Sequence, residues 1–275
     1  MKHFITYILI TVAIITAACS SREKEAAAVL EHAQELFERN EWPSAKNEVD
    51  SIRVKYPREV KVLKDALVLM RQIEMKEVER NIIYCDSLLP IRQAEAAEAS
   101  KDFVFEKDSA YEQTGTYIRQ QQTVERNIER SYIRCGVNEY GEMYVASIYF
   151  GNRPIRHTGI KVSTKDGVFT QTDSIAYDGG LNYSFQDNGN TSEILQYKGE
   201  RGVDVIKFIF SNAKERLRVD YTGGAKYSLY MSEADKQAVV YTYNLAAILS
   251  DIRNLTNERA KAIKRKEYIE GKLNQ

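Results

Sequence analysis

One histidine lies where the chain offers groups for acid–base chemistry. His157 falls in Arg153-Pro154-Ile155-Arg156-His157-Thr158, between predicted strands and beside two arginines. The arginines would suit an anion, and a histidine serves as a general base when an acidic residue orients it beside a nucleophile or water. A hydrolase would therefore need a pocket that joins His157 to an acidic residue. The competing interpretation is a solvated turn that holds an incidental histidine.

The sequence contains few residues or motifs that would bind a metal ion or a cofactor. Apart from His3, the only histidines are His32 and His157, which are too few for a His-rich metal site. The segment 187–193 gathers oxygen ligands but lacks the ligand spacing of an EF-hand, so a hairpin loop is favoured over a calcium site. Walker A, G-x-S-x-G, H-E-x-x-H and paired C-x-x-C motifs are absent from the sequence. No metal, cofactor or enzymatic activity is predicted.

Tyrosines gather in the middle of the chain, where residues 132–230 hold ten of the eighteen. The set includes Tyr140, Tyr144, Tyr149, Tyr183 and Tyr197. A row of tyrosines exposed on one sheet face would stack on sugar rings and favour a surface glycan-binding function. The alternative is that they are ordinary strand residues whose polar tips suit half-buried positions.

Charge gives no reason to expect a nucleic-acid partner. The chain has 39 basic and 39 acidic residues, so it carries no excess charge that would attract a polyanion. A basic group near the carboxyl end complements the dipole of a predicted helix, and a membrane-surface or acidic-partner contact is the alternative. Its members are Lys261, Lys264, Arg265, Lys266 and Lys272.

Strand patterns occupy residues 132–231. Residues 142–150 and 217–221 alternate with period two, and Gly-containing turns separate the apolar stretches. These features predict six to nine antiparallel strands that form either a small sandwich-like domain or a strongly twisted sheet covered by a helix. Residues 203–210 are apolar at successive positions, which is typical of a central strand buried on both faces.

Helical patterns flank this region. Residues 25–39 and 43–55 predict a helical hairpin, and 60–89 a further helix. Between them and the strands, we expect an alanine-rich helix at 93–99, short strands at 103–106 and 116–118, and a polar helix at 120–130. From 232 to 273, apolar residues recur at spacings of three and four, interrupted by Arg259 and Lys266. This predicts one long amphipathic helix that packs on the 60–89 helix, with self-association as the alternative.

The hairpin resembles one tetratricopeptide repeat. With Pro57 as the closing proline, Ala33 and Ala45 fall at the small positions where paired helices touch, and Leu36 and Trp42 at bulky positions. The resemblance implies a groove near Trp42 in which a peptide or partner helix docks. A single repeat cannot bury its own apolar face, so the hairpin needs a further helix.

The amino terminus resembles a bacterial lipoprotein signal peptide. Lys2 precedes an uncharged stretch at 4–18 that ends in Ile15-Thr16-Ala17-Ala18-Cys19, and as a helix the stretch is about 22 Å long, short of the roughly 30 Å hydrocarbon layer. The resemblance implies diacylglycerol on Cys19, cleavage before it and acylation of the new amino terminus, for example with palmitate. Ser20 would favour the outer membrane. An uncleaved anchor and a plain secretory signal are the alternatives.

Two cysteines remain after Cys19. Cys85 and Cys135 would either form a disulfide in an oxidising compartment or stay as two separate buried thiols.

Taken together, the patterns predict an α+β protein. Its parts are a signal peptide at 1–18, a helical region with the repeat-like hairpin at 19–131, an antiparallel β domain at 132–231, and a long helix at 232–275 packing on the N-terminal helices. The whole is similar to lipoproteins of Gram-negative bacteria, especially Bacteroidota. The similarity implies a membrane-tethered, non-enzymatic interaction or scaffold module that contacts other envelope proteins, with Trp42 as the partner-binding residue. The alternative is a surface lipoprotein that binds a glycan or another ligand through the tyrosine-rich domain.

Overall fold

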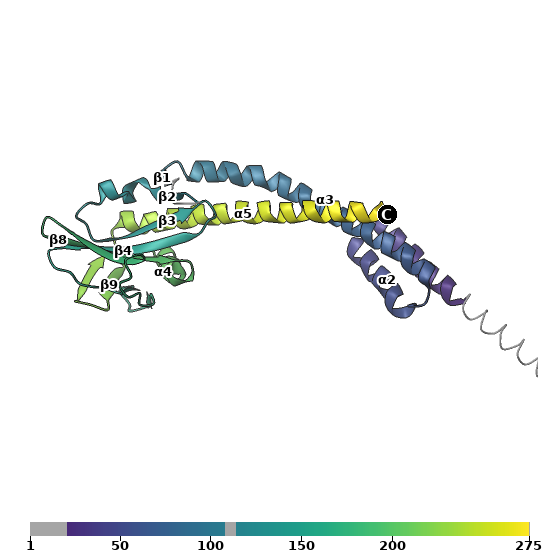
Figure 1. Ribbon diagram of the computed structural model, residues 1–275, viewed down its shortest axis with the longest axis horizontal. Coiled ribbons are helices and arrows are strands. Elements are labelled where there is room, and N and C mark those ends of the chain that lie inside the picture. Colours follow the sequence, from purple (N-terminus) through teal and green to yellow (C-terminus); the bar gives the residue numbers. More distant parts are fainter. Residues whose placement is uncertain (1–20, 108–113, 275) are drawn as a thin grey trace, which may run out of the picture. The chain divides into compact units, whose positions relative to one another are not determined.

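The computed structural model describes residues 21–107 and 114–274 (Figure 1). The predicted signal peptide and Cys19 lie outside these residues. The chain forms two compact units, one made of the part up to Ser87 together with the part from Asn257 onward, the other of Leu88–Thr256. Helices α3 (Val60–Ala99) and α5 (Glu233–Leu273) each contribute to both units. Within the described ranges, no helix is long and apolar enough to cross a membrane.

The first unit begins with a helical hairpin. A helix described over residues 21–38 is followed by α2 (Trp42–Lys55), and Asn40 turns the chain with a left-handed φ of 62°. Ala33 and Ala45 are fully buried where the sequence places close helix contact. The first turns of α3 complete this core, so the hairpin's apolar face is covered from within the chain.

The carboxyl end of α5 packs on α3, as predicted. Ala262 and Ile269 are buried there. The two cations that interrupt the apolar spacing of α5 form ion pairs with α3: Arg259 with Asp86, and Lys266 with Glu79 at 3.7 Å. Arg265 likewise pairs with Glu74 at 2.7 Å. Several basic side chains near the carboxyl end are therefore paired with acidic residues of the same chain.

The second unit contains two antiparallel sheets, and the strand order is β1-β2-β3-β4-β8-β7 in one and β10-β9-β5-β6 in the other. The strands are β1 (Phe103–Glu106), β2 (Thr116–Arg119), β3 (Tyr132–Asn138), β4 (Met143–Gly151), β5 (Gly159–Ser163), β6 (Phe169–Gln171), β7 (Asn182–Asp187), β8 (Asn190–Lys198), β9 (Arg218–Thr222) and β10 (Tyr227–Tyr230). One apolar core unites both sheets with α4 (Glu200–Ser211) and the start of α5. Strands β1 and β2, which precede residue 132, belong to the six-stranded sheet.

The predicted central strand at 203–210 is wrong, because this segment is helix α4. Its buried residues are Gly202, Val205, Ile206 and Ile209, which form one helical stripe. Gly202 also lets α4 lie close to β8, since a Cβ there would be 2.9 Å from the carbonyl oxygen of Tyr197. A short apolar run has the same residue types in a strand and in a helix. The single stripe of buried residues shows that this segment is a helix.

Two further expectations differ from the structure. The alanine-rich segment 93–99 is helical as predicted, but it is the end of α3, which continues through the exposed Pro90, and not a separate helix. The polar helix at 120–130 is replaced by two short 3-10 turns, η1 (Gln120–Gln122) and η2 (Val124–Arg126). Of the two alternatives for Cys85 and Cys135, the structure has the second, because both are free, buried thiols, and burial raises the pKa of Cys135 to about 12.

The helical stripe of α4 can be tested by truncation. Ile206→Ala and Ile209→Ala should each lower the free energy of unfolding by about 2–4 kcal/mol, because both side chains are buried. The half-buried Val203, as Val203→Ala, should cost less than about 1.5 kcal/mol. Urea unfolding measures all three. A large cost at only one of the two isoleucines would contradict the helix.

Candidate functional site

His157 joins a buried serine and a buried glutamate. Ser147 lies on β4, Glu193 on β8, and His157 on the connection that leads from β4 to β5 in the other sheet. The Ser147 Oγ is 2.9 Å from His157 Nε2, and His157 Nδ1 is 2.8 Å from Glu193 Oε2. The three residues are at most 3 % exposed. The solvated-turn interpretation of His157 is therefore wrong.

The Glu193 carboxylate also holds the backbone of this connection. It accepts hydrogen bonds from the N–H groups of Ile155 and Arg156 at 2.7 Å and of His157 at 3.1 Å. The left-handed Arg156, with φ of 56°, turns these groups toward one point, the arrangement known as an anion-binding nest. Burial raises the pKa of Glu193, but the hydrogen bonds from His157 and Arg156 outweigh it and leave the pKa below its ordinary value. The predicted anion site thus holds the chain's own carboxylate.

The order Ser–His–Glu is also that of an acyl-transfer triad. Here the Ser147 side chain points toward the core between Val145 and Tyr149, and the residue is 0 % exposed. The adjoining cavity is lined by His157 and Glu193 but not by Ser147. A nucleophile must reach its substrate, and the Ser147 hydroxyl is not accessible in this arrangement. The cluster fixes the β4–β5 connection.

A second feature is an open apolar groove on the outer face of the six-stranded sheet, the face opposite the core. Its floor alternates with the core residues along β4 and β8 and includes Ile148, Phe150 and Ile194. The edge strand β7 adds Tyr183 and Phe185, which are 38 % and 53 % exposed. The groove has a volume of about 320 Å³.

One wall of this groove is the segment 124–130, which has little regular structure. Val124 and Ile128 expose 54 % and 70 % of their surface there. Apolar side chains so exposed beside an apolar floor mark an interaction surface more clearly than single exposed residues do.

The groove continues into a polar region of about 820 Å³ on the same face. Arg134, Tyr144 and Gln196 border both parts. Arg134 forms an ion pair with Glu106 at 3.5 Å, and burial raises the pKa of Tyr144, so its phenol stays protonated. The outer face therefore passes from an apolar to a polar lining along the strands.

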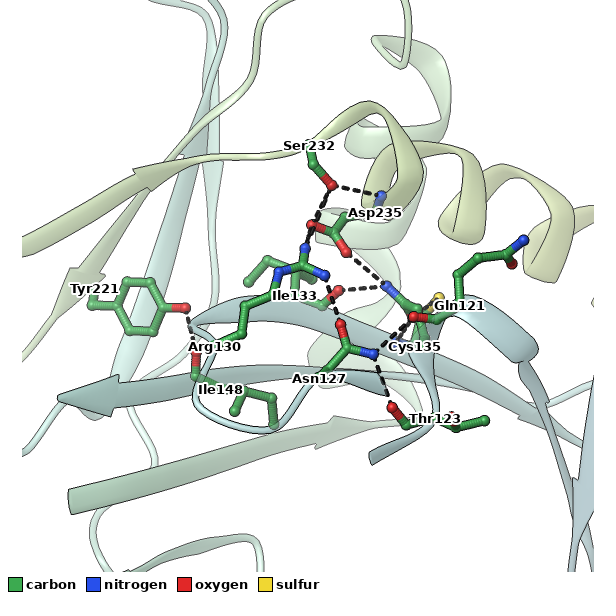
Figure 2. A network of polar contacts seen from close by, with 11 residues as sticks. Gln121, Thr123, Asn127, Arg130, Ile133, Cys135, Ile148, Tyr221, Ser232 and Asp235 are labelled. Atoms are coloured by element: carbon green, nitrogen blue, oxygen red, sulfur yellow. Dashed lines mark hydrogen bonds and ion pairs between the residues drawn. The ribbon is translucent and has the colours of Figure 1, made fainter. Parts of the chain in front are cut away.

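A polar network holds the wall segment in place (Figure 2). The carboxylate of Asp235, at the start of α5, pairs with Arg130 and accepts a hydrogen bond from Ser232 Oγ at 2.6 Å. Gln122 bridges to β3: its Nε2 donates to the carbonyl oxygen of Ile133 at 2.8 Å, and its Oε1 accepts from the N–H of Cys135 at 2.9 Å. Asp235 thus ties the wall to α5 through Arg130, and Gln122 ties the segment just before the wall to the sheet.

Asn127 completes the support from inside the wall. Its Nδ2 donates to the carbonyl oxygens of Gln121 and Thr123, both at 2.8 Å, and its Oδ1 accepts from Arg130 at 2.6 Å (Figure 2). These side-chain hydrogen bonds take the place of the backbone hydrogen bonds that the predicted helix at 120–130 would have made. Sequence reasoning missed this role because the only signal was a polar run rich in Gln, Asn and Arg.

Comparisons with protein-family models, with curated proteins and with solved structures found no match. Function must therefore be argued from the geometry of this chain. Among the residues that the structure describes, no three His, Cys, Asp or Glu side chains gather in a way that could hold a metal ion. The segment 187–193 contains the β7–β8 hairpin turn, as favoured above, with left-handed Asn188 and Gly189.

The remaining predicted site residues are dispersed. Trp42 is half-buried against the hairpin core, and the guanidinium of Arg80 covers its ring at 4.8 Å from the centroid. The five named tyrosines do not form one exposed row. Tyr149 and Tyr197 point into the core, whereas Tyr144 and Tyr183 border the groove and Tyr140 lies beside Arg253.

The structural role of Glu193 predicts a pH-dependent stability. Glu193→Gln should lower the free energy of unfolding by roughly 3 kcal/mol at pH 7, because it removes a buried charge that its partners require. Because the pKa of Glu193 is lower in the folded protein than its ordinary value of 4.5, the ionised carboxylate stabilises the fold at pH values above 4.5. This stabilisation is lost as the pH falls through the folded pKa. The difference between wild type and variant should therefore shrink below pH 4.5.

Urea unfolding between pH 3 and 7 would measure this difference. Glu142→Gln is the control, since Glu142 pairs with Arg253 at an exposed site and should contribute at most about 1 kcal/mol. Equal costs at Glu193 and Glu142 would show that the nest does not hold the connection.

Proposed function

We propose that this chain is a lipid-anchored protein of the bacterial envelope that binds other proteins and has no catalytic role. The observation that supports the proposal best is the outer-face groove, whose apolar floor and exposed wall are kept open by a buried polar network. Binding surfaces of this kind have an apolar centre and a polar rim.

The partner that fits is an extended polypeptide segment. Strand β8 (Asn190–Lys198) runs the length of the groove, which at about 3.4 Å per residue is roughly 30 Å. Asp187 lies at the hairpin-turn end of the groove. Lys198 borders the opposite polar region, where Glu106 and Glu142 are paired with Arg134 and Arg253. A segment with apolar residues in its middle, a basic residue at the first end and an acidic residue at the second would match both lining and charge.

The repeat-like hairpin is the other candidate docking surface. Its resemblance to a tetratricopeptide repeat supports a helical scaffold, and Trp42 remains a candidate contact. However, α3 occupies the hairpin's apolar face and Arg80 covers one face of the Trp42 ring. Less apolar surface is therefore left there for a partner than in the groove.

The lipid anchor is proposed from the sequence around Cys19. Cys19→Ser should move the protein from the membrane fraction to the soluble fraction and abolish incorporation of a palmitate analogue, because the thiol is the acylation site. Mass spectrometry of the wild-type amino terminus should find acylated Cys19. An unmodified terminus with membrane retention would instead indicate an uncleaved anchor.

The groove can be tested by crosslinking the tethered protein in intact membranes. Ile128→Ser should reduce the yield of crosslinked partner at least fivefold, since Ile128 is 70 % exposed on the groove wall and its loss removes apolar contact. The matched control is Ile83→Ser on α3, because Ile83 is 68 % exposed and lies outside the groove.

Both variants should keep the wild-type thermal unfolding midpoint, which excludes a folding defect. Equal yields from the two isoleucine variants would contradict the groove. Loss of the partner only in Trp42→Ala would move the site to the hairpin.

A further inference from the structure

Next to the His157 cluster lies a cavity that the proposed protein-binding function does not use. It has a volume of about 700 Å³, which is within the usual range for small-molecule sites. It shares only Phe185 with the apolar groove. The two sites are therefore separable by mutation.

The cavity lining is mostly uncharged and hydrogen-bonding. It contains the hydroxyl or amide side chains of Thr158, Asn182, Ser184, Gln186 and Thr191. Two aromatic rings join them, Tyr177 at 68 % exposure and Phe185 at 53 %. Exposed rings offer flat apolar faces to the C–H face of a sugar, and amides and hydroxyls exchange hydrogen bonds with its hydroxyl groups.

The charges of the lining limit the class of ligand that the cavity could bind. Among the described residues of the lining, Glu193 is the only acidic one, and its oxygens are already occupied by His157 and by backbone N–H groups. The guanidinium of Arg156 has no hydrogen-bond or ion-pair partner among the described residues, and Arg156 is the only arginine or lysine in the lining. A single cation suits one carboxylate better than a phosphate cluster, and a cationic ligand would find no free acid.

The position of Arg156 is also fixed. Its N–H donates to Glu193 at 2.7 Å, and its left-handed backbone is part of the nest. A side chain that extends from a constrained backbone loses less freedom on binding than one on a mobile loop.

We propose that this cavity binds a carboxylate-bearing sugar, such as a uronic acid unit of an acidic glycan. Arg156 pairs with the carboxylate, Tyr177 packs on the ring, and the amide and hydroxyl side chains bind its hydroxyl groups. This site is independent of protein binding in the apolar groove.

Calorimetry on the full-length chain in detergent tests the site with trigalacturonate, neutral galactotriose and inorganic phosphate. Trigalacturonate should bind more tightly than the other two. Arg156→Gln should lower its affinity at least tenfold, to the level of galactotriose, and Tyr177→Ala should weaken both sugars. Arg153→Gln and Tyr84→Ala are matched controls, since both side chains are exposed and lie outside the lining, and they should bind like wild type.

Several outcomes would overturn the proposal. These are no sugar binding by the wild type, equal losses in Arg156→Gln and Arg153→Gln, or phosphate binding as tight as trigalacturonate. Ile128→Ser should leave sugar binding unchanged, so failure of the sugar site and failure of the protein-binding groove are distinguishable.

Discussion

The buried carboxylate of Asp235 is the group on which the second unit depends most. Asp235 stands in the first turn of α5, where its N–H donates to Ser232 Oγ at 3.1 Å and the helix dipole favours a negative charge. From there it pairs with Arg130 and accepts from Gln122. Burying a carboxylate is costly unless it is paired and hydrogen-bonded, and Asp235 is only 3 % exposed. Its partners therefore hold the start of α5, the groove wall and β3 to one geometry.

Glu193 repeats this device at the other candidate site. Each acid is buried, each accepts several hydrogen bonds, and each fixes a segment without regular structure, 124–130 in one case and 155–157 in the other. Irregular backbone cannot satisfy its own polar groups, so a buried acid that collects N–H or guanidinium donors specifies one conformation among many. Both binding surfaces are thus bordered by loops whose shape is set from inside the core.

The sequence predicts those parts of the fold that repeat a local pattern. The α5 stripe, the hairpin helices and the Asn188-Gly189 turn follow from spacing and turn chemistry alone. The prediction of a strand at α4 was wrong because a short apolar run fits a strand as well as a helix. The His157–Glu193 pair could not be foreseen, since its members lie 36 positions apart and meet only after β4 and β8 pair. The groove could not be foreseen either, because one of its walls is positioned only by tertiary contacts.

Alternation along β7 explains how one edge strand borders two proposed sites of different chemistry. Tyr183 borders only the apolar groove and Phe185 borders both sites, whereas Ser184 and Gln186 line only the polar cavity. This division depends on register, because a shift of one residue would move every side chain to the opposite face. The two-residue turn between Asp187 and Asn190 fixes that register. This turn, which itself borders the groove, therefore determines which side chains each face of the sheet presents.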